Sequence, residues 1–352
     1  MDVPIIDITD WNEDPTHRAE LAGAIDSVCR TVGFFKIGGH GIDPALIDRL
    51  FAVTDAFFAM AEEAKLANVT PPEVDRGYTP LGREALSYSV GLDTPPDLFE
   101  AFNVGVGELL GVDPSEGVLW ASNVWPESPP DLRPVWLDYC RALYDLADRL
   151  LGIFAVALDL PPDWLQVRAD RSPDVLRALN YERRPGNPDP VDGQLRMGAH
   201  ADYGTCTILL ADPVPGLQIL GLDGIWHDVT PTPGTFLVNI GDLLAAWTND
   251  RWRSTLHRVL PPPAGVDGPA RRRSFAYFHE ANPEVIVEPV PSCVTDADPV
   301  RYEPFSVGDH LTGKVVGPRT LTASVATSTL GDRADRIAVG AEASTDRAEV
   351  RP

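Results

Sequence analysis

Three side chains in the second half of the sequence could together bind a metal ion. His200 and Asp202 are separated by one residue and come just before a strand-like run. Side chains two apart in an extended chain project to the same face, so this pair can chelate one ion. His257 lies in a second strand-like run, at residues 254–259, which a folded sheet could bring beside the pair. Two imidazoles and a carboxylate suit non-haem iron(II) with open coordination positions, although the same ligands can also bind zinc.

The remaining histidines have no carboxylate two positions away on a strand, and we expect them to be structural: His17, His40, His227, His279 and His310. Of these, only His279, directly after the strand-like run at 274–278, is a candidate for a hydrogen bond that orients a metal ligand. Ser254 or Thr255 could instead pair with His257 as nucleophile and base. The sequence contains no G-x-S-x-G turn, so this hydrolytic alternative is not favoured.

The composition limits the classes of partner. The chain has 352 residues, of which 44% are hydrophobic and 23% charged, and its formal net charge is −23. Such a charge would repel a phosphate backbone or an anionic membrane over most of the surface, so neither is an expected partner. A small-molecule substrate is compatible with it, and the oligomeric state is left open.

Several features predict a cytoplasmic protein. No run of 18 consecutive apolar residues occurs, and the first residues do not combine a basic stretch with an apolar one. The four cysteines lie far apart and form no C-x-x-C pair. This spacing indicates buried thiols rather than a disulfide framework or a zinc knuckle.

Apolar periodicity predicts helices in the first half of the chain and short strands in the second. Helical patterns end near Gly33, begin at Pro44, and extend from about 132 to 158. Residues 67–130 are rich in Pro and Gly and predict irregular covering structure with a few short elements. Strand-like runs occupy residues 3–8, 33–37, 176–181, 205–210, 217–220, 235–240, 254–259 and 274–278.

Many short strands at regular spacing imply a sandwich or jelly roll. We therefore expect an α+β fold: a double-stranded β-helix (jelly-roll) core with flanking helices, a long spine helix and a mixed α/β N-terminal region. The expected units are residues 1–130 for that region, 131–330 for the spine helix and core, and 331–352 for a polar, disordered tail.

Further stretches agree, in the same order, with one known family. They are PIID at 4–7, GFFKIGGHG at 33–41, FF at 57–58 ahead of Lys65, HAD at 200–202, PGLQ at 215–218, VNIGD at 238–242, and STLHRV at 254–259. On these motifs the chain resembles the isopenicillin N synthase-like branch of the 2-oxoglutarate- and iron(II)-dependent dioxygenases. The resemblance implies a jelly-roll core with His200, Asp202 and His257 as the iron ligands.

The same resemblance implies an R-x-S motif on a late strand, and Arg272 and Ser274 occupy that place. A guanidinium pairs bidentately with a carboxylate, so these two residues would hold the distal carboxylate of 2-oxoglutarate. Tyr181 stands where relatives often place a tyrosine that contacts co-substrate or substrate, with a core tyrosine as the competing interpretation.

Other arginines near these motifs have no implied role. Arg271 and Arg273 are expected to be surface charges. Arg183, Arg184 and Arg196 could meet an anionic substrate, but a place on the surface is the expectation for each.

The reaction implied by the resemblance consumes O2 and 2-oxoglutarate, releases succinate and CO2, and hydroxylates a small natural-product or amino-acid-derived substrate, with desaturation or cyclisation as variants. An alternative is a 2-oxoglutarate-independent iron(II) oxidase of the isopenicillin N synthase type. A remote alternative is a non-catalytic jelly-roll protein with a structural zinc. Arg272 and Ser274 count against that one, because a structural metal site has no need of them.

Overall fold

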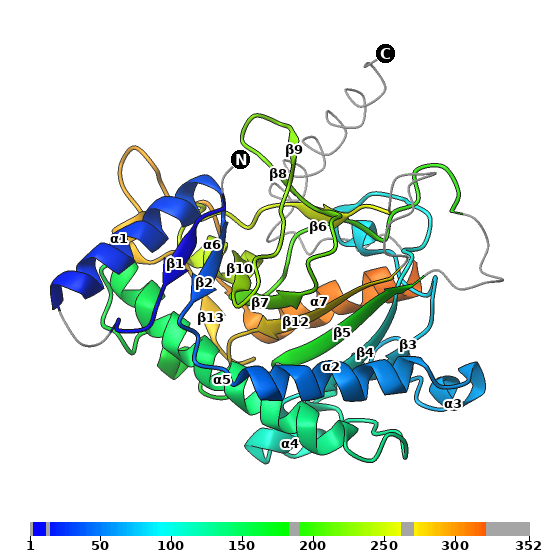
Figure 1. The fold of residues 1–352 in the computed structure, drawn as a ribbon. Helices are drawn as coiled ribbons and strands as arrows, with labels where there is room; N and C mark the ends of the chain where they lie inside the picture. Colours follow the sequence, from blue (N-terminus) through cyan, green and yellow to red (C-terminus); the bar gives the residue numbers. More distant parts are fainter. Residues whose placement is uncertain (1–2, 12–14, 183–189, 262–270, 322–352) are drawn as a thin grey trace.

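The computed structural model describes residues 3–11, 15–182, 190–261 and 271–321. Two β-sheets face each other at its centre (Figure 1). The larger sheet has, in spatial order, strands β1 (Ile5–Asp7), β2 (Phe34–Gly38), β10 (Phe236–Ile240), β7 (Cys206–Ala211), β12 (Arg271–His279), β5 (Val175–Glu182), β4 (Glu100–Gly105) and β3 (Gly77–Thr79). The smaller has β6 (Met197–His200), β11 (His257–Val259), β8 (Leu217–Leu220) and β9 (Trp226–Asp228). Strands β13 (Ile286–Val287) and β14 (Phe305–Ser306) form a separate pair.

The helices pack mainly on the outer face of the larger sheet, where α2 and α5 run beneath it in Figure 1. The α-helices are α1 (Pro15–Thr31), α2 (Pro44–Phe58), α3 (Glu62–Leu66), α4 (Gly107–Leu110), α5 (Leu132–Ala157), α6 (Asp242–Trp247) and α7 (Val307–Thr320). The 3-10 helices are η1 (Leu86–Val90), η2 (Pro114–Glu116), η3 (Val118–Trp120), η4 (Gln166–Arg168) and η5 (Pro291–Cys293). Among the described residues, no helix combines the length and apolar character needed to cross a membrane.

Strand β12 separates the helical core from the interior between the sheets. Its odd-numbered residues face the helices: the ring of Phe275 makes edge contacts with Phe51 of α2 and with Trp136 of α5. Its even-numbered residues line a cavity between the two sheets. This period of two follows from the pleat of a strand, which sends successive side chains to opposite faces.

Sequence patterns and local capping explain where the main helices begin and end. The Asp43 side chain accepts a hydrogen bond of 2.9 Å from the backbone N–H of Ala45, and Pro44 opens α2, which is a favoured start for a helix. Helix α5 presents a continuous buried stripe and ends shortly before Pro161, where a proline would interrupt further helical hydrogen bonds. The expected spine helix at 132–158 is thereby confirmed.

The jelly-roll fold is confirmed, but three expectations on individual elements are wrong. Strand β4 is one of the short elements within 67–130, but it lies inside the larger sheet between β5 and β3 and not in covering structure as expected. The expected strand at 254–259 shortens to β11, and before it the Ser254 hydroxyl bonds Asp242 and the Thr255 hydroxyl bonds the carbonyl of Val32. Arg196 is buried rather than exposed. Arg183, Arg184 and the expected tail at 331–352 lie outside the described residues.

Candidate metal centre and co-substrate cavity

The smaller sheet brings the three predicted metal ligands together. His200 ends β6, His257 begins β11, and the two residues are paired in register. Asp202 follows in the loop after β6. The Asp202 Oδ1 atom lies 3.7 Å from Nε2 of each histidine, and one potential ligand atom from each residue lies within 4.8 Å of the others. All three side chains are buried.

Each histidine makes a hydrogen bond through Nδ1, which leaves its Nε2 atom available for a metal. The Nδ1 atom of His200 is 2.8 Å from the carbonyl of Gly198, and that of His257 is 3.2 Å from the carbonyl of Thr255. A carbonyl only accepts, so Nδ1 carries the proton in both rings and Nε2 keeps its lone pair for a metal.

The carboxylate of Asp202 is fixed in the same way. Its Oδ2 atom accepts hydrogen bonds from the Thr207 hydroxyl at 2.5 Å and from the Asn239 amide at 2.7 Å. These donors come from β7 and β10 of the larger sheet, so both sheets contribute to the geometry. Oδ1 is left for a metal.

The protonation state of His200 also suits metal binding. Burial, and then the neighbouring His257, lower the pKa of His200, which keeps its imidazole neutral as a metal ligand must be. Two neutral imidazoles and one carboxylate placed on one side of a point fit iron(II) with open positions on the other side. Those positions face a cavity of about 390 Å³.

The floor of this cavity consists of the paired strands β5 and β12. Arg272 is opposite Tyr181 in this pairing, Ser274 is opposite Leu179, and all four residues line the cavity. The Arg272 side chain is 1% exposed. One of its terminal N–H groups donates to the Ser274 hydroxyl at 3.3 Å, and its guanidinium lies over the Tyr181 ring at 5.1 Å.

The Arg272 guanidinium has a hydrogen-bond donor that the described residues do not use. Its Nε atom has no hydrogen-bond partner, and within the described ranges no carboxylate forms an ion pair with it. A buried, unpaired guanidinium is costly unless an anion occupies the site. The structure therefore brings Arg272, Ser274 and Tyr181 together at a place that fits a ligand carboxylate.

Two neighbouring arginines behave differently. Arg271 and Arg273 lie on the helix face of β12, half-buried, and both pair with Asp55 of α2. The expectation that they are simple surface charges is therefore only partly met. His279 bonds Asp174 at 2.7 Å, and among the described residues it makes no hydrogen bond with any of the three predicted ligands, so it does not support the triad directly.

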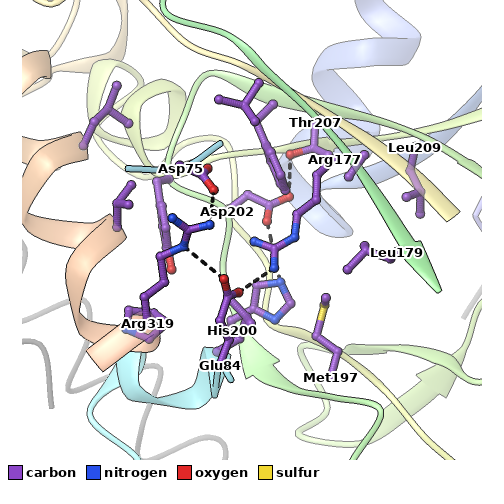
Figure 2. A pocket seen from close by; sticks show the side chains of 18 of the residues that line it. Asp75, Glu84, Arg177, Leu179, Met197, His200, Asp202, Thr207, Leu209 and Arg319 are labelled. Carbon is purple, nitrogen blue, oxygen red and sulfur yellow. Dashed lines mark hydrogen bonds and ion pairs between the residues drawn. The ribbon is translucent and has the colours of Figure 1, made fainter. Parts of the chain in front are cut away.

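A second charged group lies in the cavity, and Figure 2 shows it beside His200. Arg177 of β5 donates to Glu84 at 2.5 Å, and the other oxygen of Glu84 accepts from Nε of Arg319 at 3.0 Å. Arg319, from α7, also pairs with Asp75 at 2.7 Å. Sequence reasoning missed this array, because its members come from four separate segments and share no motif.

The comparisons with known proteins agree with this geometry. Residues 3–128 match the family model described as non-haem dioxygenase in morphine synthesis N-terminal, and residues 173–281 match the model of the 2OG-Fe(II) oxygenase superfamily. The chain is 32% identical to validamycin A dioxygenase from Streptomyces hygroscopicus subsp. limoneus, covering 82% of this chain and 79% of the relative. It is also 32% identical to a homoarginine-6-hydroxylase from Oryza sativa subsp. japonica, covering 89% and 96%.

Solved structures give the same result. The crystal structure of a full-length Neurospora crassa protein in complex with alpha-KG and thymine superposes with a TM-score of 0.78 at 30% identity, covering 90% of this chain and 96% of that one. The fold and the site define a metal-dependent oxygenase built on a jelly roll. The chain belongs to the 2OG-Fe(II) oxygenase superfamily, with iron(II) and 2-oxoglutarate as its cofactor and co-substrate.

Proposed function

We propose that His200, Asp202 and His257 bind the iron and that Arg272 and Ser274, flanked by Tyr181, bind the distal carboxylate of 2-oxoglutarate. One observation carries this assignment: the three preoriented metal ligands and a buried guanidinium with unused donors line one cavity. A bidentate arginine–carboxylate pair would satisfy donors that are otherwise buried and unused.

Bound iron(II) and 2-oxoglutarate together supply the oxidising chemistry, with O2 consumed and succinate and CO2 released. The residues of the chain hold the ligands in place, orient the substrate and exclude water. We propose hydroxylation of a small natural-product or amino-acid-derived molecule. Relatives named for validamycin A and homoarginine, and a neighbour crystallised with thymine, support a substrate of this size.

The two alternatives differ in what they require. An oxidase that works without 2-oxoglutarate would leave Arg272 to bind a carboxylate of its substrate, and relatives named as 2-oxoglutarate-dependent enzymes count against it. A structural zinc site would need neither Arg272 nor a cavity beside the metal.

Two organisational proposals accompany the function. We propose that residues 1–130 form the N-terminal region and residues 131–330 the spine helix and oxygenase core, which the separate matches at 3–128 and 173–281 support. We also propose a cytoplasmic location, supported by four free, buried cysteines, which suit a reducing compartment.

Anaerobic titration of iron(II), with and without 2-oxoglutarate, tests the assignment. We expect a weak visible charge-transfer band that needs both ligands, and its loss in His257→Ala. His227→Ala is the matched control, because His227 lies on the same small sheet and pairs with Asp223. A band that survives in His257→Ala would contradict the metal assignment, and iron binding without a band would favour the 2-oxoglutarate-independent oxidase.

A further inference from the structure

Glu280 is a buried carboxylate in the cavity, and nothing in the proposed iron and 2-oxoglutarate sites uses it. It is 7% exposed, and its Oε2 atom has no hydrogen-bond partner among the residues that the structure describes. Native proteins rarely leave a buried carboxylate oxygen unpaired. The side chain is therefore poised to accept a hydrogen bond from a ligand.

The position of Glu280 follows from the alternation of β12. Residues 272, 274, 276, 278 and 280 all line the cavity, so Glu280 continues the row that begins with Arg272. Eight residues of extended chain separate the two by about 26 Å. Arg272 and Glu280 therefore lie at opposite ends of the cavity floor.

The Glu280 end of the floor is the end beside the metal centre. The carboxylate packs against the backbone of Gly204, so closely that a side-chain carbon at Gly204 would collide with it. Gly204 lies two residues after Asp202. A substrate held at Glu280 would thus lie near the loop that carries Asp202, away from the Arg272 site.

The other acids that line the interior of the cavity already have partners. Glu84 bonds both Arg177 and Arg319, and Asp75 accepts from Arg319 and from the amide of Asn103. These two acids and two arginines balance in charge. Asp202 is bonded by Thr207 and Asn239 and faces the metal centre.

The chain holds Glu280 firmly in this position. The Asp174 side chain accepts from the backbone N–H of Glu280 at 2.9 Å through Oδ1. Its Oδ2 atom accepts from the Tyr277 hydroxyl and from Nδ1 of His279, both at 2.7 Å. The end of β12 is therefore anchored by three hydrogen bonds, which leave the Glu280 carboxylate free for a ligand.

We propose that Glu280 binds a positively charged nitrogen group of the substrate, an amine or a guanidinium. The inference rests on the proposed function and assigns the substrate class of that same site. The contacts support it: among the described acids inside the cavity, Glu280 is the one whose side chain makes no ion pair or hydrogen bond, and a cationic N–H group would supply both. Burial and then Asp174 raise the pKa of Glu280, an effect that an adjacent cation would offset.

Paired ligands test this proposal in the full chain loaded anaerobically with iron(II) and 2-oxoglutarate. L-Homoarginine is compared with L-homocitrulline, and L-arginine with L-citrulline, because each pair exchanges a cationic guanidinium for a neutral urea of the same shape. Binding is measured by calorimetry in wild type, in Glu280→Gln and in Glu284→Gln. Glu284 is an acid on the surface four residues away and provides the matched control.

We expect at least one cationic ligand to bind wild type and the Glu284→Gln protein at least tenfold more tightly than its neutral partner, and Glu280→Gln to abolish this preference. If no cationic ligand is preferred, or if the preference survives in Glu280→Gln, the inference is overturned. The visible band of the iron and 2-oxoglutarate complex is recorded in the same samples. Its presence shows that the proposed function stands even where the role of Glu280 fails.

Discussion

Replacement of Arg272 by alanine is the most informative perturbation of the co-substrate site. The guanidinium is 1% exposed and has unused donors, so a carboxylate bound there would receive two charge-assisted hydrogen bonds away from water. Each is worth about 1.5–3 kcal/mol. Together they predict a loss of about 3–6 kcal/mol, which corresponds to roughly 100- to 20,000-fold weaker binding of 2-oxoglutarate.

The assay is anaerobic titration of the iron-loaded protein with 2-oxoglutarate, followed by the visible charge-transfer band. Ser274→Ala should weaken binding by roughly 10- to 150-fold, since it removes one hydrogen bond of about 1.5–3 kcal/mol from a hydroxyl to the charged carboxylate. Arg273→Ala is the matched control, because the next residue of β12 points to the opposite face and pairs with Asp55 and Asp212. If Arg272→Ala binds iron and 2-oxoglutarate as wild type does, the reasoning about the unpaired guanidinium is refuted.

Three further predictions concern the metal centre, pH and the core. Asn239→Leu removes one donor to Asp202 and should weaken iron binding about tenfold in an equilibrium titration; unchanged affinity would show that Thr207 alone suffices. Burial raises the pKa of Asp97 to about 7, so between pH 5 and 7 the folded protein holds a proton that the unfolded chain has released. In denaturant titrations, the free energy of unfolding of wild type relative to Asp97→Asn should therefore fall by up to about 1.4 kcal/mol per pH unit over this range. A flat difference would contradict the raised pKa. Phe275→Ala should lower the free energy of unfolding by about 3–5 kcal/mol, because it opens a cavity between β12 and the helices; a loss below about 1 kcal/mol would contradict this packing.

Local signals in the sequence predicted the cluster of proposed metal ligands. His200 and Asp202 are separated by one residue in a segment expected to be extended, and His257 lies in a strand-like run with a recognisable motif. Their convergence needs only that β6 and β11 pair, which the structure confirms. The long helix was predictable for a similar reason, since α5 carries one continuous apolar stripe.

Elements without such local signals could not be predicted. Helix α7 contains Pro318 within its span and several glycines, so neither periodicity nor propensity marks it. Strand β4 is buried on both faces and shows no alternation. Glu84 and Arg319 reach the cavity through contacts between segments that are far apart in the sequence. Glu280 faces the cavity because of the alternation along β12.

The alternation along β12 also constrains how this segment can change. Substitution at an odd-numbered position alters one contact with the helices, and substitution at an even-numbered position alters one contact in the cavity. Insertion of a single residue between Arg272 and Glu280 would exchange the two faces for every residue beyond it. Phe275 or Tyr277 would then be driven into the cavity and Glu280 turned away from it. The length of this strand should therefore tolerate changes of two residues better than changes of one.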